Sequence, residues 1–232
     1  MSNGIDQTPA FEALRTQIAR DLRPVKPLVL TRWLAGFLLL FAPLSGLLLW
    51  YRFGLRGENG VLDSLWLWGL SGAELLLGYA VLIWILREAV PGRRLDTVGL
   101  RVVAGAALLL HVLITLVTYA KSPLEVPAGH GWMYGLYCFR FEVLIGGACL
   151  LFILWLSRQG LTTHPRRIGL MGGLGAGLVA DAIWRLVCPY SDHHHSFGSH
   201  TSAILTLVVV GGALALGWES WRARHLRGRS RG

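Results

Sequence analysis

Charged residues are scarce in this 232-residue chain, because Asp, Glu, Lys and Arg together make up 15% of it. In an average soluble domain, roughly a quarter of the residues are charged. Hydrophobic residues make up 53%. The N-terminal segment also lacks a short apolar core followed by a small-residue cleavage site, so no secretory signal peptide is expected. The composition argues against a soluble domain and indicates an integral membrane protein.

Long polar stretches are also missing beyond the first 32 residues. A membrane-spanning helix needs about 20 mostly apolar residues, and six runs qualify. We therefore predict an all-α, polytopic fold with six transmembrane helices. Its parts are an amphipathic arm at 1–32, a transmembrane domain at 33–221 and a basic tail at 222–232. The predicted spans are 33–51, 64–86, 99–119, 138–156, 168–187 and 203–221.

Basic residues are few on one side of these spans. Of the 22 Lys and Arg residues, 17 fall in the arm, the second and fourth connections and the tail. The positive-inside rule then places both termini in the cytoplasm (N-in/C-in), in the inner membrane of a bacterium. The net charge of +9 is explained by arginines that flank spans, so no direct nucleic-acid contact is expected.

The arm carries a stripe of apolar residues at helical spacing, namely Phe11, Leu14, Ile18 and Leu22. Arginines lie off this stripe, and two prolines end the pattern before the first span. The stripe fits a helix lying on anionic membrane lipid, or a helix that docks a cytoplasmic partner. The pattern alone favours the interpretation that this helix lies on membrane lipid.

Ionisable residues inside spans are costly and usually face the bundle interior with partners. Asp181 and Arg185, four residues apart, are expected to pair, and Glu74 and His111 lie at a similar depth. A structural role is the first expectation for the whole set, and a proton relay, quinone site or haem site is the alternative. The predicted intramembrane polar residues are Glu74, His111, Arg140, Glu142, Asp181 and Arg185.

Glycine is abundant in "GLMGGLGAGLVAD", residues 169–181. The segment resembles a phosphate-binding loop only superficially, because it lacks the following Lys-Ser/Thr and no strand precedes it. Small residues three and four apart in a span instead predict close helix packing.

Cysteine is rare, with three in the chain. Cys149 is expected to be an inert buried thiol. Cys138 opens the fourth span and Cys188 closes the fifth, so a short helical hairpin brings both to the outer surface. Nearby arginines are expected to lower the pKa of these thiols. Three states remain open, namely a static disulfide, unpaired inert thiols, and a redox-switchable or metal-capturing pair, which we favour.

Histidines follow the second of these cysteines in "CPYSDHHHSFGSH", residues 188–200. Thiolate and imidazole together suit soft metal ions, although the spacing matches no zinc-finger pattern and a solvated loop explains it equally. No resident cofactor is required, and a transient soft metal ion is the candidate ligand. The candidate metal ligands are Cys138, Cys188, His193, His194, His195 and His200.

Four segments together resemble the NrsF family of six-span bacterial anti-sigma factors. They are "ARDLRPVKPL" before the first span, "LREAVPGRR" closing the second, the Cys opening the fourth and "CPYSDHHHSFGSH" closing the fifth. The resemblance covers nearly the whole chain. It implies a non-enzymatic regulator that holds an extracytoplasmic-function (ECF) sigma factor at the inner membrane, with the arm as the binding element.

The resemblance also implies which residues respond to the signal. Two outward cysteines serve this role in the family, and they correspond to Cys138 and Cys188. The family's Cys-Pro with a downstream His corresponds to Cys188, Pro189 and His200, whereas Cys149 and the run 193–195 are additions that inherit no role. The alternative function is a membrane oxidoreductase or cofactor subunit in which His111 and Glu74 hold haem or protonate quinone.

Overall fold

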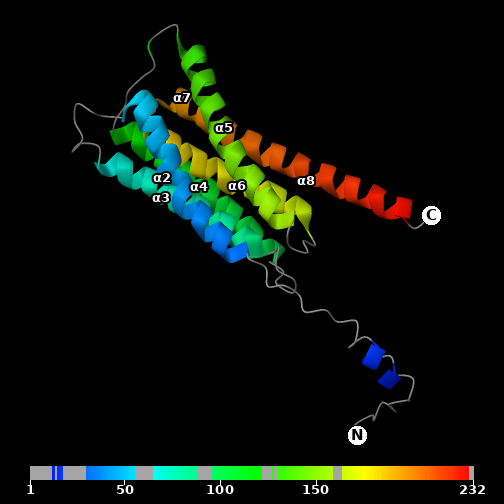
Figure 1. Cartoon of the computed structure of the whole chain (residues 1–232). Helices are drawn as coiled ribbons and strands as arrows, with labels where there is room; N and C mark the ends of the chain where they lie inside the picture. Colours follow the sequence, from blue (N-terminus) through cyan, green and yellow to red (C-terminus); the bar gives the residue numbers. More distant parts are fainter. Residues whose placement is uncertain are drawn as a thin grey trace.

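Helices account for nearly all of the described backbone in the computed structural model (Figure 1). The structure describes residues 12–13, 15–17, 30–55, 65–87, 96–121, 127, 130–158 and 164–229. Within these ranges no strand occurs. The helices are α2 (Leu30–Phe53), α3 (Leu65–Leu86), α4 (Thr97–Lys121), α5 (Gly131–Arg158), α6 (Pro165–Trp184), α7 (His193–His195), the π-helical turn η2 (Ser196–Thr201) and α8 (Ser202–Arg229).

An all-α membrane fold is therefore confirmed. Among the described residues, five segments are long and apolar enough to cross a membrane, and they lie in α2, α3, α4, α5 and the η2–α8 segment. Helix α6 is not among them, because Asp181 and five glycines dilute its apolar content. The count of six spans and the cytoplasmic placement of both termini stay predictions. Large apolar side chains such as Leu39, Leu44 and Val209 cover the outside of the bundle, as lipid contact requires.

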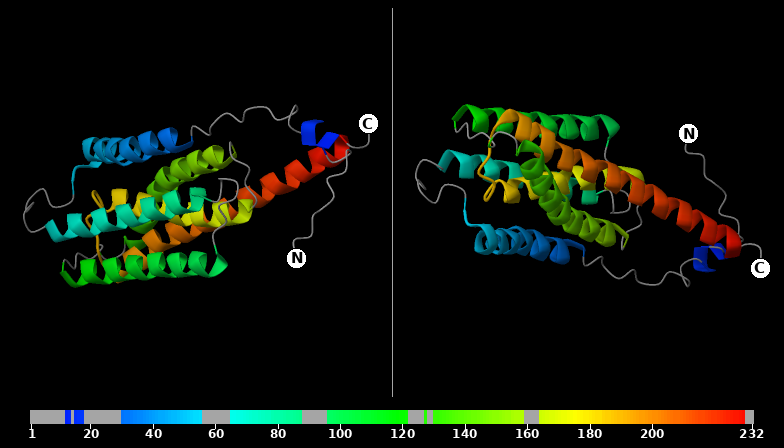
Figure 2. Two further views of the ribbon diagram at one scale, coloured as in Figure 1. Left: turned by 90° about the horizontal axis from the view of Figure 1, so that it is seen from below. Right: turned by 90° about the horizontal axis from the view of Figure 1, so that it is seen from above.

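Helix α6 is the centre of the bundle and is buried along most of its length. It packs against α8, α3 and α5. Helices α2 and α4 lie on opposite sides of these central helices in both views of Figure 2. Pro165 begins α6, where its fixed φ suits the first helical turn.

Close packing of α6 against α8 depends on glycine, as the sequence predicted. A Cβ atom at Gly173 would overlap the backbone of Leu207 and Val208, and one at Gly169 would overlap the backbone of Gly211. Small residues at such contacts let two membrane helices approach until their backbones touch. The glycine-rich segment is therefore a packing surface.

Replacing Gly173 with Ala is expected to destabilise the protein by about 1–3 kcal/mol, because α6 and α8 must separate to admit the methyl group. The measurement is thermal unfolding of the detergent-solubilised chain. Gly147→Ala on α5 is the matched control, since a Cβ there meets no atom within 4 Å and alanine is the better helix former. Equal melting temperatures for the two variants would contradict the role of Gly173.

The observed helix ends differ from the predicted spans in three places. Helix α5 begins at Gly131, so Cys138 lies two turns inside it; the added turns carry Trp132 and Tyr134, residues suited to a membrane interface. Helix α6 ends at Trp184, and Arg185 caps it. Helix α8 continues to Arg229 and extends past the rest of the bundle, so most of the predicted tail is helical (Figure 1).

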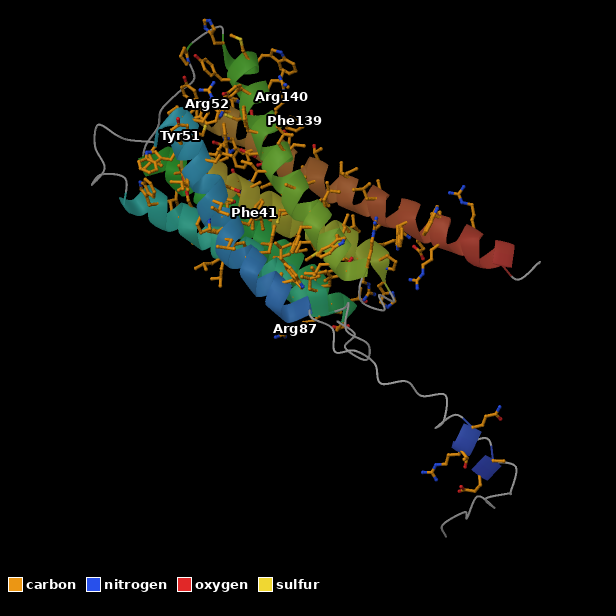
Figure 3. All side chains as sticks on the ribbon, in the orientation of Figure 1. Phe41, Tyr51, Arg52, Arg87, Phe139 and Arg140 are labelled. Atoms are coloured by element: carbon orange, nitrogen blue, oxygen red, sulfur yellow. The ribbon has the colours of Figure 1, made fainter. Side chains whose placement is uncertain are left out.

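Side chains at the two ends of the bundle can be compared in Figure 3, where Arg52 and Arg140 lie at one end and Arg87 at the other. The first end also carries α7 and the start of α5. In the arm, the described residues 12–13 and 15–17 are helical, and Thr16 Oγ1 donates to the Glu12 carbonyl. The predicted stripe residues Phe11, Leu14, Ile18 and Leu22 lie outside the described residues.

Candidate functional site

The chain between α6 and α8 turns back into the bundle at residues 185–201. Asp192 caps α7, with its Oδ1 accepting from the His195 backbone N–H at 2.9 Å. The π-helical turn η2 follows and packs against α5 and α8. π-Helical turns often occur at functional sites. The cap and the turn together direct His195 and His200 inward, and both side chains are buried.

Cys138 and Cys188 meet at this point although 50 residues separate them. Their Sγ atoms lie 3.6 Å apart, and both thiols are free and buried. Cys188 also approaches its neighbour Tyr190, with its Sγ 3.7 Å from that carbonyl oxygen. The predicted pairing of the two cysteines at one end of a hairpin is thus seen in the geometry.

The pKa of Cys188 does not follow the sequence prediction. The hydrogen bond with Cys138 and burial raise it above its usual value. The expected lowering by Arg185 is absent because that guanidinium pairs with Asp181 and Glu74 instead.

Two histidines complete a group that we name the thiol–imidazole cluster, consisting of Cys138, Cys188, His195 and His200. Each residue offers one donor atom, and these atoms all lie within 4.8 Å of one another. His195 Nε2 lies 3.5 Å from Cys188 Sγ. His194 is exposed and outside the cluster, and the side chain of His193 lies outside the described residues.

A second group, the ion cluster, lies beside the first and consists of Glu74, His111, Glu142, Asp181, Arg185 and His200. Its members come from α3, α4, α5, α6, the α6 cap and η2, and all are buried. Arg185 Nε lies 2.9 Å from Asp181 Oδ2 and 3.2 Å from Glu74 Oε2. Its Nη2 donates to Thr115 Oγ1 at 2.8 Å. The predicted Asp181–Arg185 pair is present.

His111 uses both ring nitrogens inside the ion cluster. Nδ1 lies 2.6 Å from Glu74 Oε1 and 3.3 Å from Asp181 Oδ2, and Nε2 lies 3.0 Å from Thr201 Oγ1. A haem ligand needs one ring nitrogen for iron. His111 would have to give up one of these contacts, so the geometry weighs against the haem alternative.

His200 belongs to both clusters. Its Nδ1 lies 2.7 Å from Asp181 Oδ1 and 2.6 Å from Glu142 Oε1. Sequence reasoning did not connect His200 with these carboxylates. The sequence did indicate that Glu142 lies near Cys138. It follows Cys138 by four residues and therefore lies on the same face of the helix. Arg140, two residues earlier, is exposed and does not face this group.

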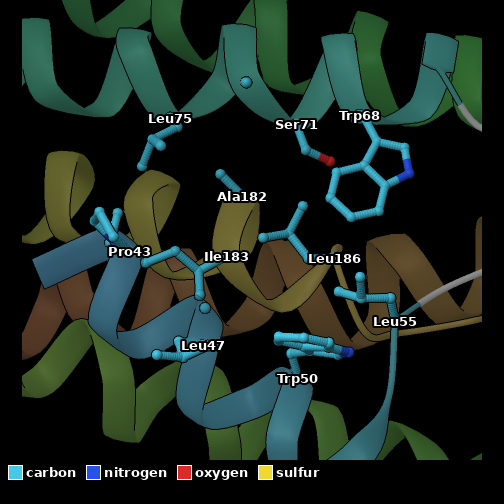
Figure 4. Close-up of a pocket in the computed structure, with 13 residues that line it drawn as sticks. Pro43, Leu47, Trp50, Leu55, Trp68, Ser71, Leu75, Ala182, Ile183 and Leu186 are labelled. Carbon is cyan, nitrogen blue, oxygen red and sulfur yellow. The ribbon is translucent and has the colours of Figure 1, made fainter.

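The described residues line several cavities on the bundle surface, one of them beside the thiol–imidazole cluster. A cavity of about 510 Å³ lies between α2, α3 and α6 (Figure 4), and among the described residues that line it none is titratable. Its walls include Pro43, Trp50, Trp68 and Leu75. The cavity beside the thiol–imidazole cluster has a volume of about 630 Å³ and is lined in part by Trp132, Asp192, His195 and Ser199.

Comparison with known proteins identifies the family. The family model described as NrsF, negative regulator of sigma F, matches residues 18–221. The chain belongs to the NrsF family. It is a membrane-embedded negative regulator of a sigma factor, and a sigma factor is its partner. No curated protein and no solved structure matches the chain. The NrsF match spans both clusters and the long helices, and residues 1–17 and the end of α8 lie beyond it.

Proposed function

We propose that the chain holds an ECF sigma factor at the cytoplasmic face of a bacterial inner membrane and releases it when Cys138 and Cys188 react on the outer side. The observation that carries this proposal is the meeting of two thiols, 3.6 Å apart, from segments 50 residues distant. The trigger is an oxidant or a soft metal ion. The role is regulatory, and no enzymatic step is needed.

The chemistry of the trigger follows from the two sulfur atoms. A two-electron oxidant such as hypochlorite joins the thiols in a disulfide, taking two electrons while two protons leave. A soft metal ion instead binds both sulfurs as thiolates. Either event fixes α5 to the segment after α6, and a difference of a few kcal/mol between two packings is enough to switch the partner's binding.

The outward position of the thiols rests on the basic residues. Arginines and lysines concentrate in the arm, the connections after α3 and α5, and the end of α8. Since the arm and the end of α8 then face the cytoplasm, the thiol–imidazole cluster at the other end faces the periplasm, where disulfides form readily.

The arm is the proposed sigma-binding element, and Leu14→Asp tests it. Burying a large apolar side chain contributes about 1.5–3 kcal/mol, so a charge in the stripe should release the sigma factor. A sigma-dependent reporter is expected to become fully active without inducer, while the membrane level of the variant stays normal.

Thr16→Asp is the matched control, because it adds the same charge to the exposed opposite face of the arm helix. It should leave repression intact. Full repression by Leu14→Asp at a normal membrane level would show that the arm binds lipid alone and would refute this part of the proposal.

A further inference from the structure

We propose that Cys138, Cys188, His195 and His200 form a tetrahedral site for a d¹⁰ divalent ion, Zn²⁺ or Cd²⁺, and that Asp181 orients His200 as a ligand. The inference rests on the proposed function, since the ion would be the soft metal that the same thiols respond to. It goes further by naming four ligands, a coordination geometry and a positioning residue.

Two of the distances between donor atoms match the edges of a tetrahedron, and all four donor atoms lie within 4.8 Å of one another. With Zn–S of about 2.3 Å and Zn–N of about 2.0–2.1 Å, tetrahedral angles place two sulfurs about 3.8 Å apart and a sulfur and a nitrogen about 3.5 Å apart. The Cys138 Sγ–Cys188 Sγ distance is 3.6 Å, and the Cys188 Sγ–His195 Nε2 distance is 3.5 Å. These two separations already have the length that a bound ion requires, so both sulfurs and His195 need little movement to bind it.

His200 already has the orientation of a metal ligand. Its Nδ1 is engaged by Asp181 and Glu142, at 2.7 Å and 2.6 Å. This leaves Nε2 as the donor, and that atom is buried without a hydrogen-bond partner among the described residues. A histidine that binds a metal almost always donates its other N–H to a carboxylate or carbonyl, which fixes the ring. Asp181 accepts this second hydrogen bond, and the Glu142 carboxylate lies within ion-pair distance of the same nitrogen.

Charge favours a divalent ion in this buried place. Cys138 and Cys188 are both at most 5% exposed. Two thiolates and one divalent cation sum to zero, so the loaded site carries no net charge into the apolar interior, where an uncompensated charge is costly. Two sulfurs and two imidazole nitrogens are also a donor set that Zn²⁺ accepts in structural sites.

An ion can reach the site through the cavity of about 630 Å³ beside it. His195 lines this cavity and also contacts Cys188, so it connects the open side with the buried sulfurs. The Asp192 side chain lies in the same wall and adds an acidic group along the approach.

The test is metal binding by the purified full chain, reduced and held in detergent, with Co²⁺ as the spectroscopic probe. We expect one Co²⁺ per chain, with the intense visible bands of a tetrahedral ion, a thiolate charge-transfer band, and displacement by Zn²⁺ or Cd²⁺. Mild oxidation of the unmodified chain with diamide should abolish binding, which tests the sulfurs without any substitution.

Substitutions then assign the four ligands. Cys138→Ser and Cys188→Ser should each remove the tetrahedral spectrum, and His195→Ala and His200→Ala should each weaken binding at least tenfold. Cys149→Ser and His194→Ala are the controls and should bind as the unmodified chain does. Asp181→Asn should lower affinity by about 10–100-fold while keeping the spectrum, as expected for a positioning residue.

Three results would overturn the site, namely less than one ion per reduced chain, an octahedral spectrum, or equal binding by the oxidised chain.

Other results distinguish a failure of the metal site from a failure of the proposed function. A sigma-dependent reporter that responds to hypochlorite without stoichiometric metal binding would refute the site alone. Suppose instead that the chain binds one tetrahedral ion, but the reporter is induced normally after both cysteines are replaced with serine. That result would support the site and refute its regulatory role.

Discussion

Replacing Cys138 or Cys188 with serine is expected to abolish induction as completely as replacing both. The two sulfurs lie 3.6 Å apart and act as one unit. Neither a disulfide nor a two-thiolate metal site survives with one sulfur. Each single variant and the double variant should therefore leave a sigma-dependent reporter at its uninduced level after treatment with hypochlorite, cadmium or copper.

Cys149→Ser is the matched control for this experiment. Cys149 lies on the same helix, α5, and is also buried, but it is absent from the thiol–imidazole cluster. Its substitution should leave induction normal as long as the protein accumulates. Normal induction in the double Cys138 and Cys188 variant would return this pair to a structural role and refute the sensor.

Replacing Arg185 with glutamine is expected to cause the largest loss of stability. The guanidinium is 5% exposed and compensates the carboxylates of Asp181 and Glu74. Removing one partner of a buried ion pair costs about 3–5 kcal/mol, because the remaining charge has no compensation. The variant should fail to accumulate in the membrane, or should unfold at a clearly lower temperature in detergent.

Arg140→Gln removes the same charge from an exposed position on α5. It should change neither the level of the protein in the membrane nor its unfolding temperature. Arg185→Lys should recover part of the lost stability, since an ammonium keeps the charge but not the arrangement of guanidinium donors. Equal accumulation and unfolding temperatures for Arg185→Gln and Arg140→Gln would contradict the structural importance of the ion cluster.

The sequence was most informative where hydrophobic length decides the structure. Every predicted apolar run corresponds to a long helix, because a span needs about 20 such residues whatever its neighbours are. Helix ends were less predictable. The first turns of α5 carry aromatic residues that suit a membrane interface, so the helix begins at Gly131 although the apolar run begins later.

Depth along the membrane normal was readable from the sequence, but rotation about a helix axis was not. Depth placed Cys138 and Cys188 at one level, and spacing paired Asp181 with Arg185. The contacts of His200 depend on how η2 folds back onto α5 and α6, and no local pattern encodes a π-helical turn. The exposure of Arg140 beside the buried Glu142 also required the helix rotation that only the packed bundle supplies.

The glycine contact between α6 and α8 has a mechanical consequence for the segment that joins them. Backbones that touch cannot approach further, so the two anchors of residues 185–201 cannot move closer together. A disulfide bond that draws Cys138 toward Cys188 must therefore displace α5 relative to α6 and α8. At the far end of α5, the Arg158 guanidinium lies 4.1 Å over the ring of Trp218 on α8. A tilt of α5 would therefore change the surroundings of the Trp218 indole, a fluorophore at the end of α5 opposite Cys138.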